Sequence, residues 1–370
     1  MARALGIIAF ERDRVRVQGI SDFRPFSSIS FLGRYRLIDF PMSNLSNSGC
    51  TTIHIYVKEK PRSVFEHVGT GRHYNMNAKQ GKLRVMYGEE PITSNIYNTD
   101  VTSYYQNLQY IEEEKSEYVI VTSSQYVFVQ NYDEALTAHI ESGADVTYLY
   151  KNTEEGKTRF LNSNYLTFEK GRRITKTELN RGQAKNRSIS LDTYIMKKSL
   201  FVKLVNEAQN TSPIYWFSDV LDDNLQSLNC VGLNVRSNVY EISDLTSYYR
   251  SNMELIDPDK SGLFNENWPI YTRTNDSPPT RYTKDAKVTN SLIANGAVIE
   301  GTVRNSIVGR GAVVGKGAVV ENSILLANAY VHDGCTLDHA ILDKHVKMVK
   351  TKELIGEPED LVYIRRRDLI

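Results

Sequence analysis

Two different spacings of apolar residues divide this chain into an N-terminal and a C-terminal part. Up to residue 256, apolar runs of strand length alternate with stretches in which apolar residues recur at helical spacing. The strand-like runs are Ala4–Phe10, Thr51–Val57, Tyr118–Thr122 and Val146–Tyr150, and Tyr104–Glu113 is a helical stretch. Strands that alternate with helices predict a mostly parallel sheet with helices on both faces.

In the C-terminal part the spacing of apolar residues changes to six. Aliphatic residues recur at this interval at Ile307, Val313, Val319, Leu325, Val331 and Leu337. Glycine and asparagine residues lie between them, as expected at the corners of a parallel β-helix. Each hexapeptide is then one side of a three-sided coil with its aliphatic residue inside, so that Ile307 stacks near Leu325. Hairpins, the alternative, would alternate apolar and polar residues at a period of two, which this segment does not do.

The boundary between the two parts is a stretch rich in Pro, Asn, Asp and Ser, which indicates a linker. We therefore predict an α/β domain at residues 1–256, a linker at 257–283, and a hexapeptide-repeat β-helix with a C-terminal strand at 284–370.

Composition excludes several classes of function. The 370 residues carry a net charge of +1, with Lys and Arg scattered along the chain, so no basic surface for nucleic acid or for a membrane is expected. The sequence contains neither an apolar run long enough to span a bilayer nor a signal-peptide pattern. Cys50, Cys230 and Cys335 are far apart and form no CxxC pair, which favours buried free thiols and a cytoplasmic protein.

Three motifs carry a resemblance to a known family. Gly33–Asn44 reads G-R-Y-R-L-I-D-F-P-M-S-N and is followed by Asn47–Gly49; Tyr105–Leu108 reads Y-Q-N-L, and Tyr248–Met253 reads Y-Y-R-S-N-M. These segments resemble signatures of the bacterial ADP-glucose pyrophosphorylases over nearly the whole chain. The resemblance implies a Rossmann-like, GT-A-like nucleotidyltransferase domain with a mixed sheet, followed by a left-handed parallel β-helix. Enzymes of that family join glucose 1-phosphate and ATP to give ADP-glucose and pyrophosphate in glycogen synthesis.

The phosphate-binding motifs of that family are altered here. The family's A-G-G-x-G-T-R-L follows the first strand, and the glycines let backbone N–H groups approach phosphate. Here Ala9–Val15 reads A-F-E-R-D-R-V, in which Phe10 and Glu11 would block that approach. The family's R-A-K-P becomes R-P-F-S at Arg24–Ser27, so Phe26 replaces the lysine that contacts phosphate in the family.

The nucleotide, metal and sugar positions that the resemblance implies are altered as well. Thr99 replaces the glycine of G-T-A-D-A, and Gln125 replaces the metal-binding aspartate of S-G-D-H. Glu241 aligns with the second metal aspartate, but one carboxylate alone is a poor site for magnesium. The aromatic residues of Tyr215–Asp219, which stands where the family has D-F-G-K-D, would fill the sugar pocket. We therefore expect no catalytic residues, no bound cofactor and no metal in this chain, with Mg²⁺ confined to a catalytic partner.

This loss of chemical positions beside intact structural motifs resembles the non-catalytic subunits of the family. The function expected is a regulatory subunit that assembles with a catalytic, GlgC-type subunit, most simply in a hetero-tetramer. The alternatives are an active nucleotidyltransferase with an altered site, and a hexapeptide-repeat acyltransferase or scaffold.

Three arginines are candidates for binding an anionic effector such as a sugar phosphate. Arg24, Arg34 and Arg36 stand at or beside the positions where the family binds such effectors, and the planar guanidinium suits phosphate oxygens. The alternative is that these arginines form structural salt bridges with Asp22 and Asp39.

Overall fold

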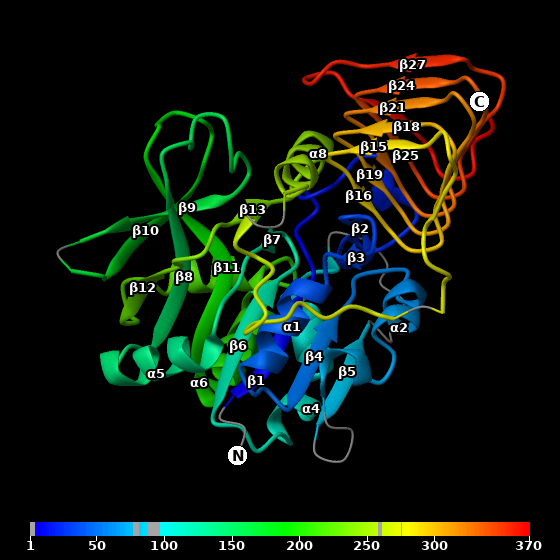
Figure 1. Ribbon diagram of the computed structural model, residues 1–370. Coiled ribbons are helices and arrows are strands. Elements are labelled where there is room, and N and C mark those ends of the chain that lie inside the picture. Colours follow the sequence, from blue (N-terminus) through cyan, green and yellow to red (C-terminus); the bar gives the residue numbers. More distant parts are fainter. Residues whose placement is uncertain (1–3, 77–80, 88–96, 170, 258–260, 275) are drawn as a thin grey trace.

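The computed structural model describes residues 4–76, 81–87, 97–169, 171–257, 261–274 and 276–370. An α/β domain forms the N-terminal part, and a prism of stacked coils, yellow to red in Figure 1, stands against one side of it.

The sheet of the α/β domain contains nine strands. They are β1 (Ala4–Ala9), β4 (Thr52–Tyr56), β5 (Lys82–Met86), β6 (Tyr118–Ser123), β8 (Val146–Thr153), β9 (Asn164–Phe168), β10 (Ile174–Leu179), β11 (Arg187–Lys197) and β12 (Cys230–Asn234). The order along the main path is β10-β9-β11-β6-β1-β4-β5, and β8 pairs with both β11 and β12. Strands β1, β4, β5 and β6 are parallel, whereas β11 is antiparallel to its neighbours, so the sheet is mixed. All four predicted strands are therefore confirmed, and β1 is buried along its whole length, as its continuous apolar run requires.

Helices cover both faces of this sheet, as predicted. Those of the domain are α1 (Asp39–Asn47), α2 (Arg62–Val68), α3 (Asp100–Gln106), α4 (Leu108–Glu112), α5 (Tyr132–Ser142), α6 (Lys198–Thr211), α7 (Phe217–Asp223) and α8 (Leu245–Glu254). One core cluster joins the sheet to α1, α2 and α5, and a second joins its other face to α3, α4, α6 and α7. The single helix predicted at Tyr104–Glu113 is in fact two, because Asn107 leaves helical geometry and its Nδ2 donates to the Ser103 carbonyl at 2.9 Å.

Short elements complete the α/β domain. They are β2 (Ser30–Phe31), β3 (Tyr35–Arg36), β7 (Tyr126–Val127), β13 (Tyr240–Glu241) and the 3₁₀ turns Ile20–Asp22, Phe26–Ser28 and Arg72–Tyr74.

The C-terminal part is a parallel β-helix of three five-stranded sheets. One sheet contains β14 (Arg281–Tyr282), β17 (Val298–Ile299), β20 (Val313–Val314), β23 (Tyr330–Val331) and β26 (Lys347–Met348). The second contains β15 (Lys287–Thr289), β18 (Thr302–Arg304), β21 (Val319–Glu321), β24 (Thr336–Asp338) and β27 (Glu353–Ile355). The third contains β16 (Leu292–Ile293), β19 (Ile307–Val308), β22 (Ile324–Leu325), β25 (Ala340–Leu342) and β28 (Val362–Ile364). The first strand begins at Arg281, inside the stretch predicted as linker.

The prediction for the inward residues of the β-helix is partly wrong. Leu325, Val331 and Leu337 do fill its core, but the three preceding positions are occupied by Val308, Val314 and Val320 in place of Ile307, Val313 and Val319. Ile307 is aligned with Ile324, 17 residues further on, and Val308 with Leu325. The six-residue interval is therefore interrupted between Val320 and Leu325, where one side of the coil is a residue shorter.

The interruption falls at a corner built from Asn-Ser pairs. Asn290, Asn305 and Asn322 each adopt a left-handed backbone conformation with φ of 43°, which asparagine tolerates better than most residues. Their side chains form a ladder: Nδ2 of Asn290 donates to Asn305 at 2.9 Å, Nδ2 of Asn305 to Asn322 at 2.6 Å, and Nδ2 of Asn322 to Asp338 at 2.9 Å. This ladder fixes how successive coils stack at that corner.

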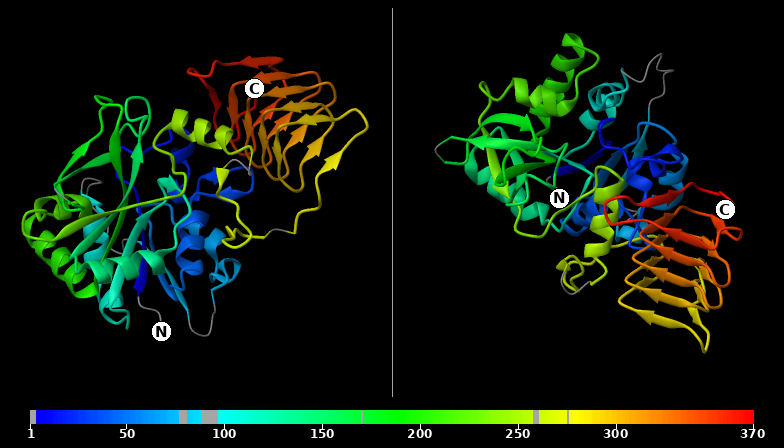
Figure 2. Two further views of the ribbon diagram at one scale, coloured as in Figure 1. Left: turned by 60° about the vertical axis from the view of Figure 1, so that its left-hand side comes forward. Right: turned by 90° about the horizontal axis from the view of Figure 1, so that it is seen from above.

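A third core cluster belongs to both domains. It combines Tyr248 and Tyr249 of α8 with Ile307, Ile324 and Ile341 of the β-helix. The segment that precedes the prism crosses the surface of the α/β domain (Figure 2), where the Trp268 Nε1 donates to Asn44 Oδ1 at 3.0 Å. The two domains are thus joined by packed apolar surface as well as by the chain.

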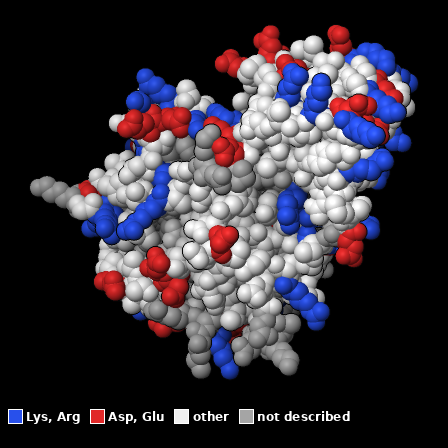
Figure 3. Space-filling model, in the orientation of Figure 1, with Lys and Arg blue, Asp and Glu red and all other residues white. Residues whose placement is uncertain are grey.

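Surface charge, helix length and the cysteines bear on the classes of protein that composition excludes. On the face shown in Figure 3, basic and acidic side chains are interspersed. Among the helices in the described part of the chain, none has both the length and the apolar character needed to cross a membrane. All three cysteines are buried free thiols.

Candidate functional site

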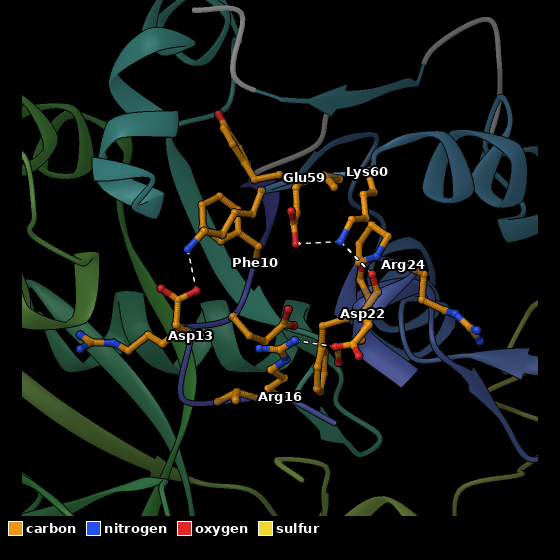
Figure 4. A pocket seen from close by; sticks show the side chains of 17 residues that line it. Phe10, Asp13, Arg16, Asp22, Arg24, Glu59 and Lys60 are labelled. Atoms are coloured by element: carbon orange, nitrogen blue, oxygen red, sulfur yellow. Dashed lines mark hydrogen bonds and ion pairs between the residues drawn. The ribbon is translucent and has the colours of Figure 1, made fainter. Parts of the chain in front are cut away.

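A cavity of about 490 Å³ lies where the parallel strands β1 and β4 end, the edge at which open α/β sheets bind ligands. The segment after β1, the segment after β4 and residues 21–27 line it, as Figure 4 shows for Phe10, Asp13, Asp22 and Glu59. This is the cleft to which the sequence resemblance assigns the nucleotide phosphates.

Glu11 occupies the position where a glycine loop would place backbone N–H groups. Its Oε1 accepts a hydrogen bond from the backbone N–H of Ser124, at the end of β6, at 3.0 Å. Burial raises the pKa of Glu11 to about 8, with a smaller contribution from nearby Asp192. The described residues provide no ion pair for it. The Glu11 carboxyl group therefore uses a backbone N–H donor at the edge of the cleft and adds an acidic group where the family has a glycine loop.

Neither Phe26 nor the lysines and arginines of the cavity are available to bind an anion. Phe26 is buried in the core cluster that the two domains share. Every lysine and arginine that lines the cavity has an acidic partner: Lys58 pairs with Asp13 at 2.7 Å, Arg16 with Asp22 at 2.5 Å, Lys60 with Glu59 at 3.3 Å, Arg12 with Asp219 at 2.5 Å and Arg24 with Asp343 at 2.8 Å. A triphosphate would have to displace these carboxylates to reach a cation.

The sugar side of the cleft is nearly closed. The cavity there measures about 40 Å³, room for a few water molecules, and Trp216 and Phe217 line it. Arg12 donates to Ser218 Oγ and to Asp219 Oδ1 at 2.5 Å each, and its guanidinium lies 5.4 Å from the centre of the Trp216 ring. The arginine thus ties the segment after β1 to the start of α7 across the place expected for a sugar.

Thr99 has a local structural role. It is the N-cap of α3, and its Oγ1 accepts a hydrogen bond from the Thr102 N–H at 3.3 Å. The next residue, Asp100, accepts from the backbone N–H of Phe217 at 2.9 Å, and burial raises its pKa to about 7. The position of the family's glycine is therefore part of a helix start that also holds α7.

The residues at the two metal positions do not fit a magnesium ion. Gln125 is buried and neutral, and its Nε2 has no partner among the described residues. Both carboxylate oxygens of Glu241 are already used: Oε2 accepts from the Phe160 N–H at 2.7 Å and Oε1 from Ser163 Oγ at 3.2 Å. In the part of the chain that the structure describes, no group of three or more His, Cys, Asp or Glu side chains could hold a metal ion.

The expectation that Arg24 pairs with Asp22 or Asp39 is wrong. Both of its hydrogen bonds, at 2.8 Å, go to the two carboxylate oxygens of Asp343 in the β-helix, whereas Asp22 pairs with Arg16. Tyr363 also donates to Asp343, at 2.9 Å. Arg24 and Asp343 are both almost fully buried, so the two domains are linked by a charged pair removed from water.

The other two arginine candidates lie beside further cations of the β-helix. Arg34 is exposed and stacks on the Tyr35 ring at 5.4 Å. Arg36 donates from Nη1 to the Ser63 carbonyl at 2.6 Å, and its backbone N–H, in place of its guanidinium, donates to Asp39 at 2.8 Å. Lys344 is the cation that sequence reasoning missed, since it lies about 300 residues away in the chain. Burial first, then repulsion from Arg36 and Arg24, lowers the pKa of Lys344 to about 7.

The comparisons with known proteins agree with this fold. Residues 15–165 match the nucleotidyl transferase family, and residues 278–361 match the GlmU-like C-terminal hexapeptide family. The chain is an α/β nucleotidyltransferase domain followed by a left-handed parallel β-helix, as the resemblance implied.

Individual relatives point the same way. The glycogen biosynthesis protein GlgD of Geobacillus stearothermophilus is 31% identical over 84% of this chain and 82% of its own length. That of Bacillus subtilis is 28% identical over 98% and 95% of the two chains. The glucose-1-phosphate adenylyltransferase of Lachnospira eligens is 29% identical over 77% and 67%. The chain therefore belongs to the GlgD type within the glucose-1-phosphate adenylyltransferase, or ADP-glucose pyrophosphorylase, family.

Proposed function

We propose that this chain is a regulatory subunit that makes no ADP-glucose itself and modulates a catalytic glucose-1-phosphate adenylyltransferase. The observation that carries the proposal is that the donors and cations of the cleft are already engaged: Glu11 uses a backbone donor there, and Arg12 is bound to Asp219 across the sugar side. Each of these contacts stands where a substrate of the family reaction would need space or a free cation.

The energetic argument concerns the charge that develops on transferring phosphate. Free cations and a metal ion stabilise that charge, and removing one such group costs several kcal/mol of the barrier. Here the phosphate lysine is replaced by Phe26, one metal carboxylate by Gln125, and the other, Glu241, holds a turn. Losing these groups together leaves little catalytic rate.

The direct test of modulation mixes this chain with a catalytic subunit of the same organism. ADP-glucose formation by the catalytic subunit is measured alone and with an equimolar amount of this chain. We expect a change in the maximal rate, in the KM for ATP or glucose 1-phosphate, or in the response to effectors. If all of these parameters are unchanged while the two chains remain bound to each other, the proposed function is wrong.

We also propose that the two subunits form a hetero-oligomer, most simply a hetero-tetramer. The support is that the β-helix has its own packed core and shares a second core with the α/β domain, although the chemical positions of the cleft are altered. Related chains with the same fold can replace one another in a symmetric assembly. Light scattering on co-expressed subunits decides this, and a mixture that contains only separate subunits contradicts it.

Effector binding near Arg36 stays a proposal in a modified form. Because Arg24 is committed to Asp343, the candidates for an anion become Arg34 and Arg36, with Lys344 beside them. The test compares Arg36→Ala with the unchanged chain in the mixed complex. A loss of the response to sugar phosphates at unchanged basal rate supports the proposal, and an unchanged response contradicts it.

A further inference from the structure

The signature residues Ser43, Asn44 and Asn47 are present in this chain, yet none of them lines the cleft. All three lie on α1, and each forms a hydrogen bond with the segment 261–274, which crosses α1 on its way to the β-helix (Figure 1). We call residues 261–274 the strap. The signature thus has a role in joining the two domains.

Three hydrogen bonds fasten the strap to α1. They are Trp268 Nε1 to Asn44 Oδ1 at 3.0 Å, Asn47 Nδ2 to the Pro269 carbonyl at 3.0 Å, and the Tyr271 N–H to Ser43 Oγ at 2.9 Å. Asn44 also donates from Nδ2 to the Phe128 carbonyl at 2.8 Å, so one side chain joins the strap to the interior of the α/β domain.

The strap is anchored at its start and tied to the β-helix at its end. Leu263 is buried in the core cluster that the two domains share, and the Phe264 ring lies 5.6 Å from the Tyr35 ring. At the other end, Arg310 of the β-helix donates from Nη2 to the Arg273 carbonyl at 2.9 Å. The strap therefore connects the β-helix to α1 through its middle part.

That middle part is held mainly by the polar contacts with α1. Trp268, Ile270 and Tyr271 are only half buried, whereas residues 265–267 and Pro269 are exposed. A segment with few buried apolar contacts opens at a lower free energy than the core of its domain. Loss of the three hydrogen bonds would free the middle of the strap while both domains stay folded.

Four arginines surround the end of the strap, and in the part of the chain that the structure describes none of them pairs with a carboxylate. They are Arg34 and Arg36 of the β2–β3 hairpin, Arg273 of the strap and Arg310 of the β-helix, whose buried Nε has no hydrogen-bond partner among the described residues. Burial is the main cause that lowers the pKa of Arg36 and of Arg310; attraction to Asp39 opposes it, and repulsion from Arg273 adds to it. Repulsion among the four arginines acts against a closed strap, and an anion bound between them would relieve it.

We propose that the strap is a releasable clasp between α1 and the β-helix, and that an anion bound by these arginines favours its closed state. The inference rests on the effector site of the proposed function and adds the element through which that site acts. An anion with higher affinity for the closed state shifts the strap toward it and so fixes the β-helix on α1. Release of the strap leaves the β-helix held by the shared apolar core alone on that side.

The first test is hydrogen exchange, measured by mass spectrometry on peptides that contain Tyr271, whose N–H donates to Ser43 in the closed strap. Asn47→Ala removes one of the three hydrogen bonds and should speed this exchange roughly two- to tenfold, the effect of one hydrogen bond on the open population. Asn206→Ala is the matched control, because the amide of Asn206 donates only to the Val202 carbonyl of its own helix. It should leave the exchange at Tyr271 unchanged.

The second test adds inorganic phosphate or glucose 6-phosphate and compares each with sodium chloride of equal ionic strength, since salt alone screens repulsion. We expect both phosphate compounds, and not chloride, to slow the exchange at Tyr271 severalfold. Arg273→Gln removes the cation of the strap, so its exchange should be slow without phosphate and should change little when phosphate is added.

Two outcomes overturn the proposal. One is an exchange rate at Tyr271 that is the same in Asn47→Ala and in the unchanged chain, which would make the strap a static connection. The other is a strap that opens in Asn47→Ala but does not respond to either phosphate compound. Because exchange is measured on this chain alone, either failure leaves the regulation of a catalytic partner standing, and failure of the mixed-enzyme assay leaves the result for the strap standing.

Discussion

The cleft at the edge of the sheet and the interface between the two domains both contain buried or partly buried charges, but they neutralise them differently. At the interface, Arg24 and Asp343 form a bidentate pair out of water, with Tyr363 as a third member. In the cleft, Glu11 has a raised pKa and no ion-pair partner among the described residues, and Arg16, which pairs with Asp22, has a side chain that is 64% exposed. The interface is thus arranged to hold the domains together, whereas each lysine and arginine that lines the described part of the cleft already has an acidic partner.

The largest effect expected from this difference is the loss of stability caused by Arg24→Ala. Removing one member of a buried pair leaves an uncompensated charge, at a cost of about 3–5 kcal/mol in the free energy of unfolding. Denaturant unfolding of the unchanged chain and the variant measures it. The double variant Arg24→Met, Asp343→Leu is the control, since it removes both charges and should recover most of the loss. Equal destabilisation by the single and double variants would contradict a charge-based link.

The next effect is a dependence of the free energy of unfolding on pH, which arises from the carboxyl group of Glu11. Because burial raises the pKa of Glu11 to about 8, only the folded state holds its proton between about pH 5 and pH 8. The free energy of unfolding should therefore fall as pH rises through this range, by up to about 4 kcal/mol, and level off above it.

Glu11→Gln isolates that contribution. Asp100 and Asp222 also have pKa values raised by burial, to about 7, and act in the same direction in both proteins. The variant should therefore show a shallower fall, and its stability relative to the unchanged chain should increase from pH 5 to pH 8. Parallel stability curves for the two proteins over this range would show that Glu11 is not buried as a neutral acid.

A smaller effect tests the packing of the β-helix. Val320 faces the core of the prism, and its neighbour Val319 is only half buried. We expect Val320→Ala to cost about 2–3 kcal/mol in the free energy of unfolding, and Val319→Ala less than about 1 kcal/mol. Equal costs, or the reverse order, would support the uninterrupted six-residue register in place of the observed one.

The smallest effect is expected at the rim of the cleft. Arg16→Ala removes a pair with Asp22 in which the arginine side chain is 64% exposed, so the loss of stability should be below about 1 kcal/mol. Thermal unfolding at low and at high salt measures it, and the difference should shrink with salt. A loss as large as that for Arg24→Ala would remove the distinction between the two regions.

Much of the fold follows from local patterns in the sequence. Runs such as Ala4–Phe10 and Tyr118–Thr122 predict strands because a strand between two layers must be apolar throughout. The break at Asn107 was missed because the apolar spacing continues across it. The one-residue shift between Val320 and Leu325 was missed because a constant interval of six was assumed, although the recurring pairs Asn290-Ser291, Asn305-Ser306 and Asn322-Ser323 mark the corner of the coil at which it occurs.

The candidate site was predictable from the sequence where the type of a single residue decides the chemistry. It was less predictable where the role of a residue depends on a side chain that is distant in the sequence. Phe10 and Glu11 in place of a glycine loop indicate that the phosphate site is altered. The structure adds that Glu11 accepts a hydrogen bond from the Ser124 N–H. No local signal pairs Arg24 with Asp343, because 319 residues separate them. Such contacts exist only after the β-helix has packed on the α/β domain.

One measurement tests the central claim most directly. The purified chain, without any partner, is incubated with ATP, glucose 1-phosphate and magnesium, and ADP-glucose and pyrophosphate are quantified against a protein-free blank. Because the cations of the cleft are paired and the metal positions do not fit magnesium, we expect no product above the blank at any magnesium concentration. Magnesium-dependent formation of ADP-glucose that disappears in the Glu241→Ala variant, with that variant still folded, would show that the chain is an enzyme and contradict the account.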